Sequence, residues 1–211
     1  MALFAVTPFV VTLPHGAIIV SVIAAAVAIS GSYAIRKRKA VFAVVINLSI
    51  GTVLSVCLLK LSPSHTLMVL SHACVVLLLA FLCVTILQYV LQHGRVTSDR
   101  IFAAICVYLL IGYAWTFTYT LLEELRPGAF AVSPAELTPA ADDYVGRVQQ
   151  FRYFSFVTLT TVGYGDVVAR SQVARTMVVL EAIMGQIYLT VLVARLVGLH
   201  IVHSTTVPDH E

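Results

Sequence analysis

The chain has 211 residues, of which 60% are hydrophobic and only 11% are Asp, Glu, Lys or Arg. Soluble domains carry about a quarter charged residues, and a soluble core of this length could not bury so much apolar surface. The formal net charge is only +3 and the bases are scattered, which excludes a nucleic-acid partner. No polar stretch is long enough for a soluble enzyme domain. The composition predicts an integral membrane protein in contact with lipid, without enzymatic activity or a cofactor.

In chain order, several segments reach the roughly 20 apolar residues that a membrane-spanning helix needs. They are residues 17–35, 40–59, 66–91, 101–122 and 173–198. Residues 1–13 are also apolar, but they are short and end at a Pro-His-Gly stop, so a sixth span stays open. We predict an all-α membrane protein with five or six transmembrane helices.

The basic link Arg36–Lys37–Arg38–Lys39 is the strongest orientation signal, because such links face the cytoplasm. Alternation of the spans then places residues 61–64 and 123–172 outside, and residues 93–100 inside. The amino terminus lies inside with six spans and outside with five. This pattern predicts a multi-pass protein of the cell membrane whose short carboxyl-terminal tail, 199–211, is cytoplasmic.

The segment 123–172 is the functional candidate. It starts acidic and loop-like, and from about residue 149 it becomes apolar and aromatic (QQFRYFSFVTLTTVGYGD). This stretch is too short to cross a bilayer, so we expect a re-entrant element, with a short helix over 149–159 and an irregular strand over 160–166. Irregular backbone at membrane depth persists only where it is buried in protein or lines a wet cavity.

Residues 160–166 read TTVGYGD, which resembles the selectivity filter of the potassium channel superfamily, and the surrounding sequence resembles its bacterial members. The resemblance covers about residues 101–198. It implies a homotetramer whose pore module consists of an outer helix (101–122), an extracellular loop (123–147), a pore helix (149–159), a filter (160–166) and an inner helix (173–198). Residues 1–92 would be amino-terminal transmembrane helices packed around this pore.

The resemblance implies that potassium ions are bound by backbone carbonyls. The carbonyls belong to Thr161, Val162, Gly163 and Tyr164, and they would replace the water around the ion. Carbonyls of an ordinary strand alternate in direction, so some residues must take a positive φ, which Gly163 and Gly165 do without steric cost. Thr160, Gly165 and Asp166 complete the filter. The negative carboxyl end of the pore helix would favour a cation.

Side chains around the filter are expected to support it. Val162 and Tyr164 would point away from the pore, and Tyr153 and Phe154 would form an aromatic cuff behind the strand. Two positions depart from the family pattern. No proline follows Asp166 closely, and Val157 stands where some members carry a buried carboxylate.

Gating residues are less clearly marked. The spans before residue 101 lack the series of basic residues that a voltage sensor requires. Gly185 lies at a distance from the filter that is similar to that of the family's hinge glycine, so it could be a gating hinge. The alternative role of this glycine is to allow close packing of helices. If the hinge applies, Gln186 lines the cavity with Leu189, Val193 and Val197. Glu181 lies about 140° from Gln186 around the helix, so it would face the pore helix or outer helix, with a structural or a gating role.

The sequence leaves three functions open. The first is a potassium-selective channel, and the second is a weakly selective cation channel that holds the same filter loosely. The third is a non-conducting membrane subunit or scaffold. A coupled potassium transporter is disfavoured, because such chains carry four filter repeats and the sequence contains one TTVGYGD string.

Overall fold

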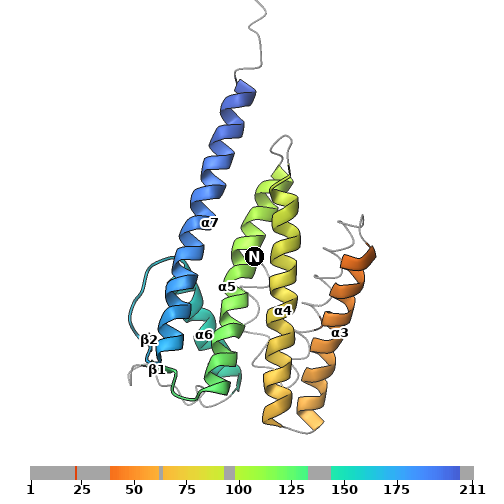
Figure 1. Cartoon of the computed structure of the whole chain (residues 1–211), viewed down its shortest axis with the longest axis vertical. Helices are drawn as coiled ribbons and strands as arrows, with labels where there is room; N and C mark the ends of the chain where they lie inside the picture. Colours follow the sequence, from red (N-terminus) through yellow and green to blue (C-terminus); the bar gives the residue numbers. More distant parts are fainter. Residues whose placement is uncertain (1–21, 23–38, 62–63, 93–97, 133–143, 205–211) are drawn as a thin grey trace, which may run out of the picture.

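The computed structural model describes residues 22, 39–61, 64–92, 98–132 and 144–204. The helices among them are α3 (Lys39–Leu61), α4 (His65–Val90), α5 (Ser98–Leu125), α6 (Tyr144–Leu159) and α7 (Gln172–Ser204). The helices α3, α4 and α5 form a row, and the long α7 lies beyond α5 (Figure 1). The predicted span over 17–35, apart from residue 22, and the short segment 1–13 lie outside the described residues.

Three helices of the described part are long and apolar enough to cross a membrane. They are α4, α5 and residues Gln172–Arg195 of α7. The span predicted over 40–59 falls within α3, whose described apolar stretch, Ala43–Ser55, is shorter than a span. These helices support a membrane protein with a mostly helical fold.

The helices that were predicted for the pore module extend beyond their predicted limits. α5 continues to Leu125, so Glu123 and Glu124 belong to its last turn and not to a loop. α6 begins at Tyr144, five residues before the predicted start. α7 continues to Ser204 and is about 50 Å long, which exceeds the roughly 30 Å of a bilayer's hydrocarbon core.

A small two-stranded sheet was not predicted, and it is an addition to a fold that is mostly helical, as the sequence predicted. Strand β1 (Phe130–Val132) pairs antiparallel with strand β2 (Val167–Ala169), with Ala131 opposite Val168. Strands of three residues are too short to show a period-two pattern, so the sequence gives no signal for them. The pairing ties the chain leaving α5 to the chain that follows segment 160–166.

The turn between α5 and β1 is closed by a carboxylate. One oxygen of Glu123 accepts a hydrogen bond from the backbone N–H of Gly128 at 2.7 Å, and the other accepts one from Phe130 at 3.1 Å. Gly128 has a φ of 83°, a conformation that favours glycine. Glu123 therefore fixes where β1 begins.

Replacing Glu123 by alanine is expected to destabilise this turn by about 1–2 kcal/mol, because two charge-assisted hydrogen bonds are lost at a partly exposed site. A fall in the apparent melting temperature of the detergent-solubilised protein would measure the effect. The control is Glu124→Ala, which removes a long ion pair of 3.4 Å to the partly exposed Arg147 side chain. Such pairs contribute about 0–1 kcal/mol, so an equal fall in both variants would contradict the assigned role of Glu123.

Two arginines converge on one backbone carbonyl beside the carboxyl end of α4. This end of α4 lies opposite the end of the molecule that holds β1 and β2 (Figure 1). Arg195 of α7 donates to the carbonyl oxygen of Gln92 at 2.6 Å, and Arg100 of α5 donates to the same oxygen at 2.9 Å. Gln92 follows the carboxyl end of α4, where positive side chains interact favourably with the helix dipole. Three helices are thus joined at this oxygen.

Candidate functional site

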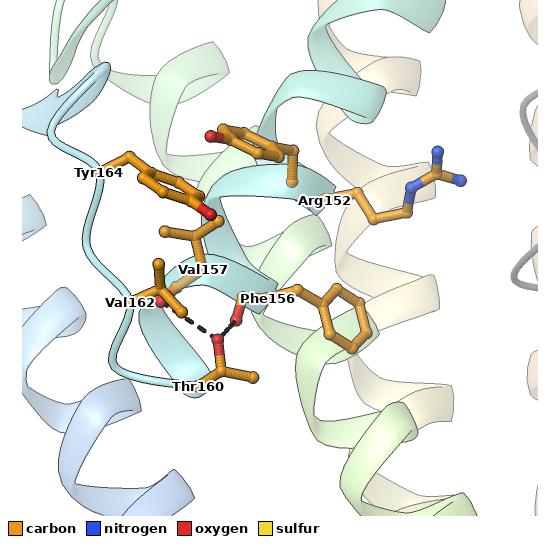
Figure 2. Close-up of a pocket in the computed structure, with 7 residues that line it drawn as sticks. Arg152, Phe156, Val157, Thr160, Val162 and Tyr164 are labelled. Carbon is orange, nitrogen blue, oxygen red and sulfur yellow. Dashed lines mark hydrogen bonds between the residues drawn. The ribbon is translucent and has the colours of Figure 1, made fainter.

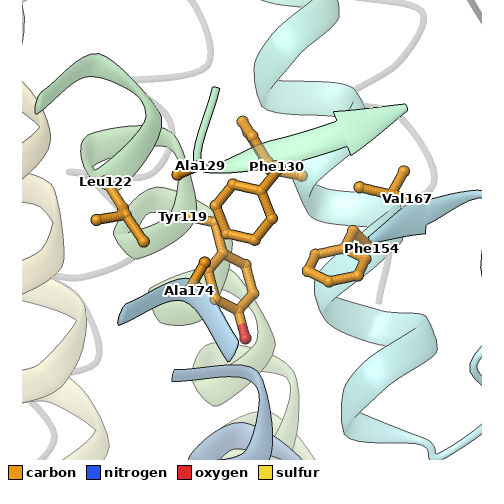
Figure 3. Packing of buried hydrophobic residues seen from close by; sticks show 8 residues of the cluster. Tyr119, Leu122, Ala129, Phe130, Phe154, Val167 and Ala174 are labelled. Carbon is orange, nitrogen blue, oxygen red and sulfur yellow. The ribbon is translucent and has the colours of Figure 1, made fainter. Parts of the chain in front are cut away.

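An aromatic cluster fixes α6 against its neighbours (Figure 3). Phe151 and Phe154 of α6 pack with Tyr119 of α5 and Phe130 of β1. The ring centroids of Phe130 and Phe151 lie 5.0 Å apart, and those of Tyr119 and Phe130 lie 5.3 Å apart. Ring pairs at such distances contribute about 0.5–1.5 kcal/mol beyond the burial of their area. The cluster holds α6 in one position beside the sheet.

The segment 160–166 follows α6 with an alternating backbone. Positive φ values occur at Thr161 (60°), Gly163 (58°) and Gly165 (80°), and at no other residue of this segment. Alternation of left- and right-handed residues turns successive carbonyls toward one side, which an ordinary strand does not do. The positive φ of both glycines agrees with the prediction from the sequence. That of Thr161 was missed, and it costs roughly 1–2 kcal/mol in a residue with a Cβ.

Hydrogen bonds attach the back of this segment to α6. The N–H groups of Thr161 and Val162 donate to the carbonyls of Thr158 and Val157, each at 2.9 Å, and Gly163 also donates to Val157, at 3.4 Å. Among the described residues, no group donates a hydrogen bond to the carbonyls of residues 161–164. Those carbonyls remain available to a ligand.

Side chains of the same segment lie on the α6 side (Figure 2). Val162 and Tyr164 line a pocket together with Tyr153 and Val157 of α6. The rings of Tyr153 and Tyr164 are stacked, with centroids 6.4 Å apart and planes 2° from parallel. The contact places Tyr153 behind the segment, where the sequence predicted it.

Phe154 lies elsewhere than predicted. Its ring contacts are with Tyr119 and Phe130 in the aromatic cluster, at centroid distances of 5.3 and 5.6 Å. Successive residues of a helix are about 100° apart, and Phe154 turns toward α5 and β1 while Tyr153 turns toward Tyr164. Among the described residues, Tyr153 alone stacks on Tyr164, and Phe154 anchors α6 to α5 and β1.

Thr160 and Asp166 make local hydrogen bonds at the two ends of the segment. The Thr160 hydroxyl donates to the carbonyl of Phe156 at 2.6 Å and closes the last turn of α6 (Figure 2). The Asp166 carboxylate accepts a hydrogen bond from the N–H of Val167 at 2.9 Å, at the start of β2. Both contacts limit the movement of the chain where it enters and leaves the segment.

Glu181 of α7 is fully buried and faces both helices that the sequence named. Its Oε2 accepts a hydrogen bond from the Tyr119 hydroxyl of α5, and its Oε1 contacts the Ser155 hydroxyl of α6, both at 2.5 Å. Neither partner was identified from the sequence. Ser155 carried one signal, since it is a small polar residue within an aromatic run.

Gly185 is a site of close packing. A Cβ built on it would lie 2.5 Å from the backbone oxygen of Leu159, the last residue of α6, and 2.9 Å from the Leu159 Cδ1. Real Cβ atoms do not approach a backbone oxygen so closely. The hydroxyl of Tyr108 from α5 donates to the same oxygen at 3.3 Å. The structure therefore favours the packing alternative over the hinge.

The next residues of α7 leave one face of the helix uncovered in the single chain. Gln186, Leu189 and Val193 are exposed, whereas Gly185 is buried. The side chain of Val197 lies outside the described part. Within the described part, no group of three His, Cys, Asp or Glu residues could hold a metal ion.

Comparison with known proteins relates part of the chain to a described family. Residues 147–199 match a family model described as ion channel. The match spans about a quarter of the chain and includes most of α6, segment 160–166, β2 and most of α7. No curated protein and no solved structure matches the chain. This part of the chain is similar to ion channels, and three helices of the described part are long and apolar enough to cross a membrane.

Proposed function

We propose that the protein is a potassium-selective channel in which segment 160–166 is the filter, α6 the pore helix, α5 the outer helix and α7 the inner helix. The observation that carries the proposal is the backbone of the filter. Its N–H groups bond back to α6, and its positive φ values recur at every second residue from 161 to 165. Such a backbone offers a row of carbonyl oxygens to a dehydrated cation.

Assembly as a homotetramer belongs to the same proposal. One strand supplies oxygens from one side only, so enclosing an ion requires several copies, and four is the number that the resemblance implies. In the single chain the apolar filter side chains Val162 and Tyr164 are 52% and 71% exposed. An adjacent copy would cover these side chains and brace the filter from outside.

Conduction is passive, and the ion is the permeant ligand. The carbonyl dipoles provide oxygens without a fixed charge, so an ion binds and is also released. The amino-terminal helices lack the basic series of a voltage sensor. The proposal places the protein in the cell membrane, with the carboxyl terminus of α7 on the cytoplasmic side.

The test is reconstitution of the purified chain into planar bilayers, with potassium on one side and sodium on the other. A large reversal potential with the potassium side negative is expected, and the mass of the detergent complex should equal four chains. A reversal potential near zero would identify a weakly selective cation channel. Absence of current from a folded tetramer would identify a non-conducting subunit or scaffold.

A further inference from the structure

Resting on the proposed function, we propose that Glu181 is a positioning residue for the filter. It is held as a neutral carboxylic acid that donates its own proton to Ser155 and thereby clamps α7 to α6 and α5. We call this arrangement of Glu181, Ser155, Tyr119 and the Gly112 carbonyl the carboxyl clamp.

The carboxyl clamp joins all three helices of the pore module. Glu181 and Ser155 are each 0% exposed, as is Tyr119. The Ser155 hydroxyl lies 2.5 Å from Glu181 Oε1 and 2.8 Å from the carbonyl oxygen of Gly112 on α5. Glu181 of the inner helix thus contacts Ser155 of the pore helix, and Ser155 contacts Gly112 of the outer helix.

A count of protons assigns the protonation state. Ser155 has one hydroxyl proton but two oxygen neighbours at hydrogen-bond distance, and the Gly112 carbonyl can only accept. Each of the two oxygen pairs, at 2.8 and 2.5 Å, needs a proton between its oxygens, and the serine proton fills the pair with Gly112, which has no other proton to receive. The proton in the remaining contact, at 2.5 Å, must then come from Glu181. Its other oxygen accepts from Tyr119, and every member of the clamp is satisfied.

The charges around the clamp agree with this assignment. The titratable groups that face Glu181 from α5 are Tyr119 and Tyr108, and neither is a cation. Among the described residues the only ion pair joins Arg147 and Glu124, so no basic residue of α6 or α7 neutralises Glu181. An unpaired carboxylate buried between membrane helices is strongly unfavourable, and a proton removes that charge.

The clamp acts on the filter through α6. Ser155 lies within one helical turn of Val157 and Thr158, whose carbonyls hold the N–H groups of residues 161–163. Fixing α6 at Ser155 therefore fixes the acceptors to which the filter is attached. Deviations of about 0.5 Å are enough to disturb a site built on exact oxygen positions.

Variants at Glu181 separate a positioning role from simple space filling. Glu181→Gln keeps one acceptor for Tyr119 and one donor for Ser155, so we expect the potassium-to-sodium permeability ratio to stay within about twofold of the wild type. Glu181→Leu keeps the volume but leaves both hydroxyls without their partner, and we expect that ratio to fall by about tenfold or more. Wild-type selectivity in Glu181→Leu would overturn the positioning role.

Infrared spectroscopy reads the proton itself, with or without conduction. The difference spectrum between the wild type and Glu181→Gln should contain the C=O stretching band of a protonated carboxylic acid, shifted in D₂O. Ser155→Ala is the second variant, to be used if Glu181→Leu does not fold. It should shift the frequency of this C=O band because the Glu181 acid loses its hydrogen-bond acceptor. Carboxylate bands in place of the acid band would overturn the neutral state. Because this measurement needs only folded protein, failure of the clamp and failure of the channel function are distinguishable.

Discussion

Gly163→Ala is expected to abolish selective potassium flux into liposomes while leaving the tetramer assembled. The φ of 58° at Gly163 is strained for an L-residue by roughly 1–2 kcal/mol, and the strain recurs in each copy. A Cβ at this position would have no atom within 4 Å in the single chain, so the backbone, not a clash, causes the effect. Relaxation to a negative φ would rotate the adjoining peptide and point an N–H where a carbonyl should face the ion.

The matched control is Gly128→Ala in the turn before β1. Gly128 has a φ of 83°, and a Cβ added there would likewise meet no atom within 4 Å. This variant carries a similar backbone strain far from the filter, so it should lower stability slightly and leave the potassium-to-sodium permeability ratio unchanged. Equal selectivity in Gly163→Ala and the wild type would remove segment 160–166 from the filter role.

The second large effect is expected for Gly185→Ala. The added methyl group would overlap the backbone oxygen of Leu159, and a helix end cannot move as cheaply as a flexible side chain. Overpacking of this kind costs about 1–3 kcal/mol in each copy, and here it pushes α7 away from the carboxyl end of α6. We expect a lower apparent melting temperature of the detergent-solubilised tetramer, together with loss of potassium flux.

Gly51→Ala in α3 is the control for this substitution. Gly51 is helical, and a Cβ there would meet no atom within 4 Å, so alanine should stabilise the helix by about 0.5–1 kcal/mol. The pair also distinguishes the two roles considered for Gly185. Unchanged melting of Gly185→Ala with altered channel opening would favour the hinge and contradict the packing assignment.

The parts of the site that the sequence predicts are those governed by local rules. Gly163 and Gly165 take the positive φ that only glycine adopts freely. Glu181 faces α5 and α6, as its position on the helix predicts. The angle between residues of a helix is fixed, so Glu181 lies on a different side of α7 from Gln186. Helical periodicity and apolar length are likewise local properties.

Features that depend on contacts between distant segments could not be predicted. The pairing of β1 with β2 joins residues almost forty positions apart and leaves no pattern in either short strand. Phe154 packs with Tyr119 and Phe130, and only the packing of α6 decides which of two adjacent aromatic residues faces the filter. The positive φ of Thr161 goes against the preference of its residue type, and the hydrogen bond of its N–H to Thr158 helps to hold it there.

The shared Gln92 carbonyl has a mechanical consequence for the carboxyl-terminal stretch of α7. Arg195 belongs to the stretch of α7 remote from segment 160–166, whereas Gln92 belongs to the chain just beyond α4. If that stretch moves outward relative to α4, the hydrogen bond from Arg195 to the Gln92 carbonyl must break. The Arg195 guanidinium then leaves the oxygen to which Arg100 also donates. The carboxyl end of α4 is therefore tethered to this stretch of α7, and one charge-assisted hydrogen bond resists the displacement of the two helices.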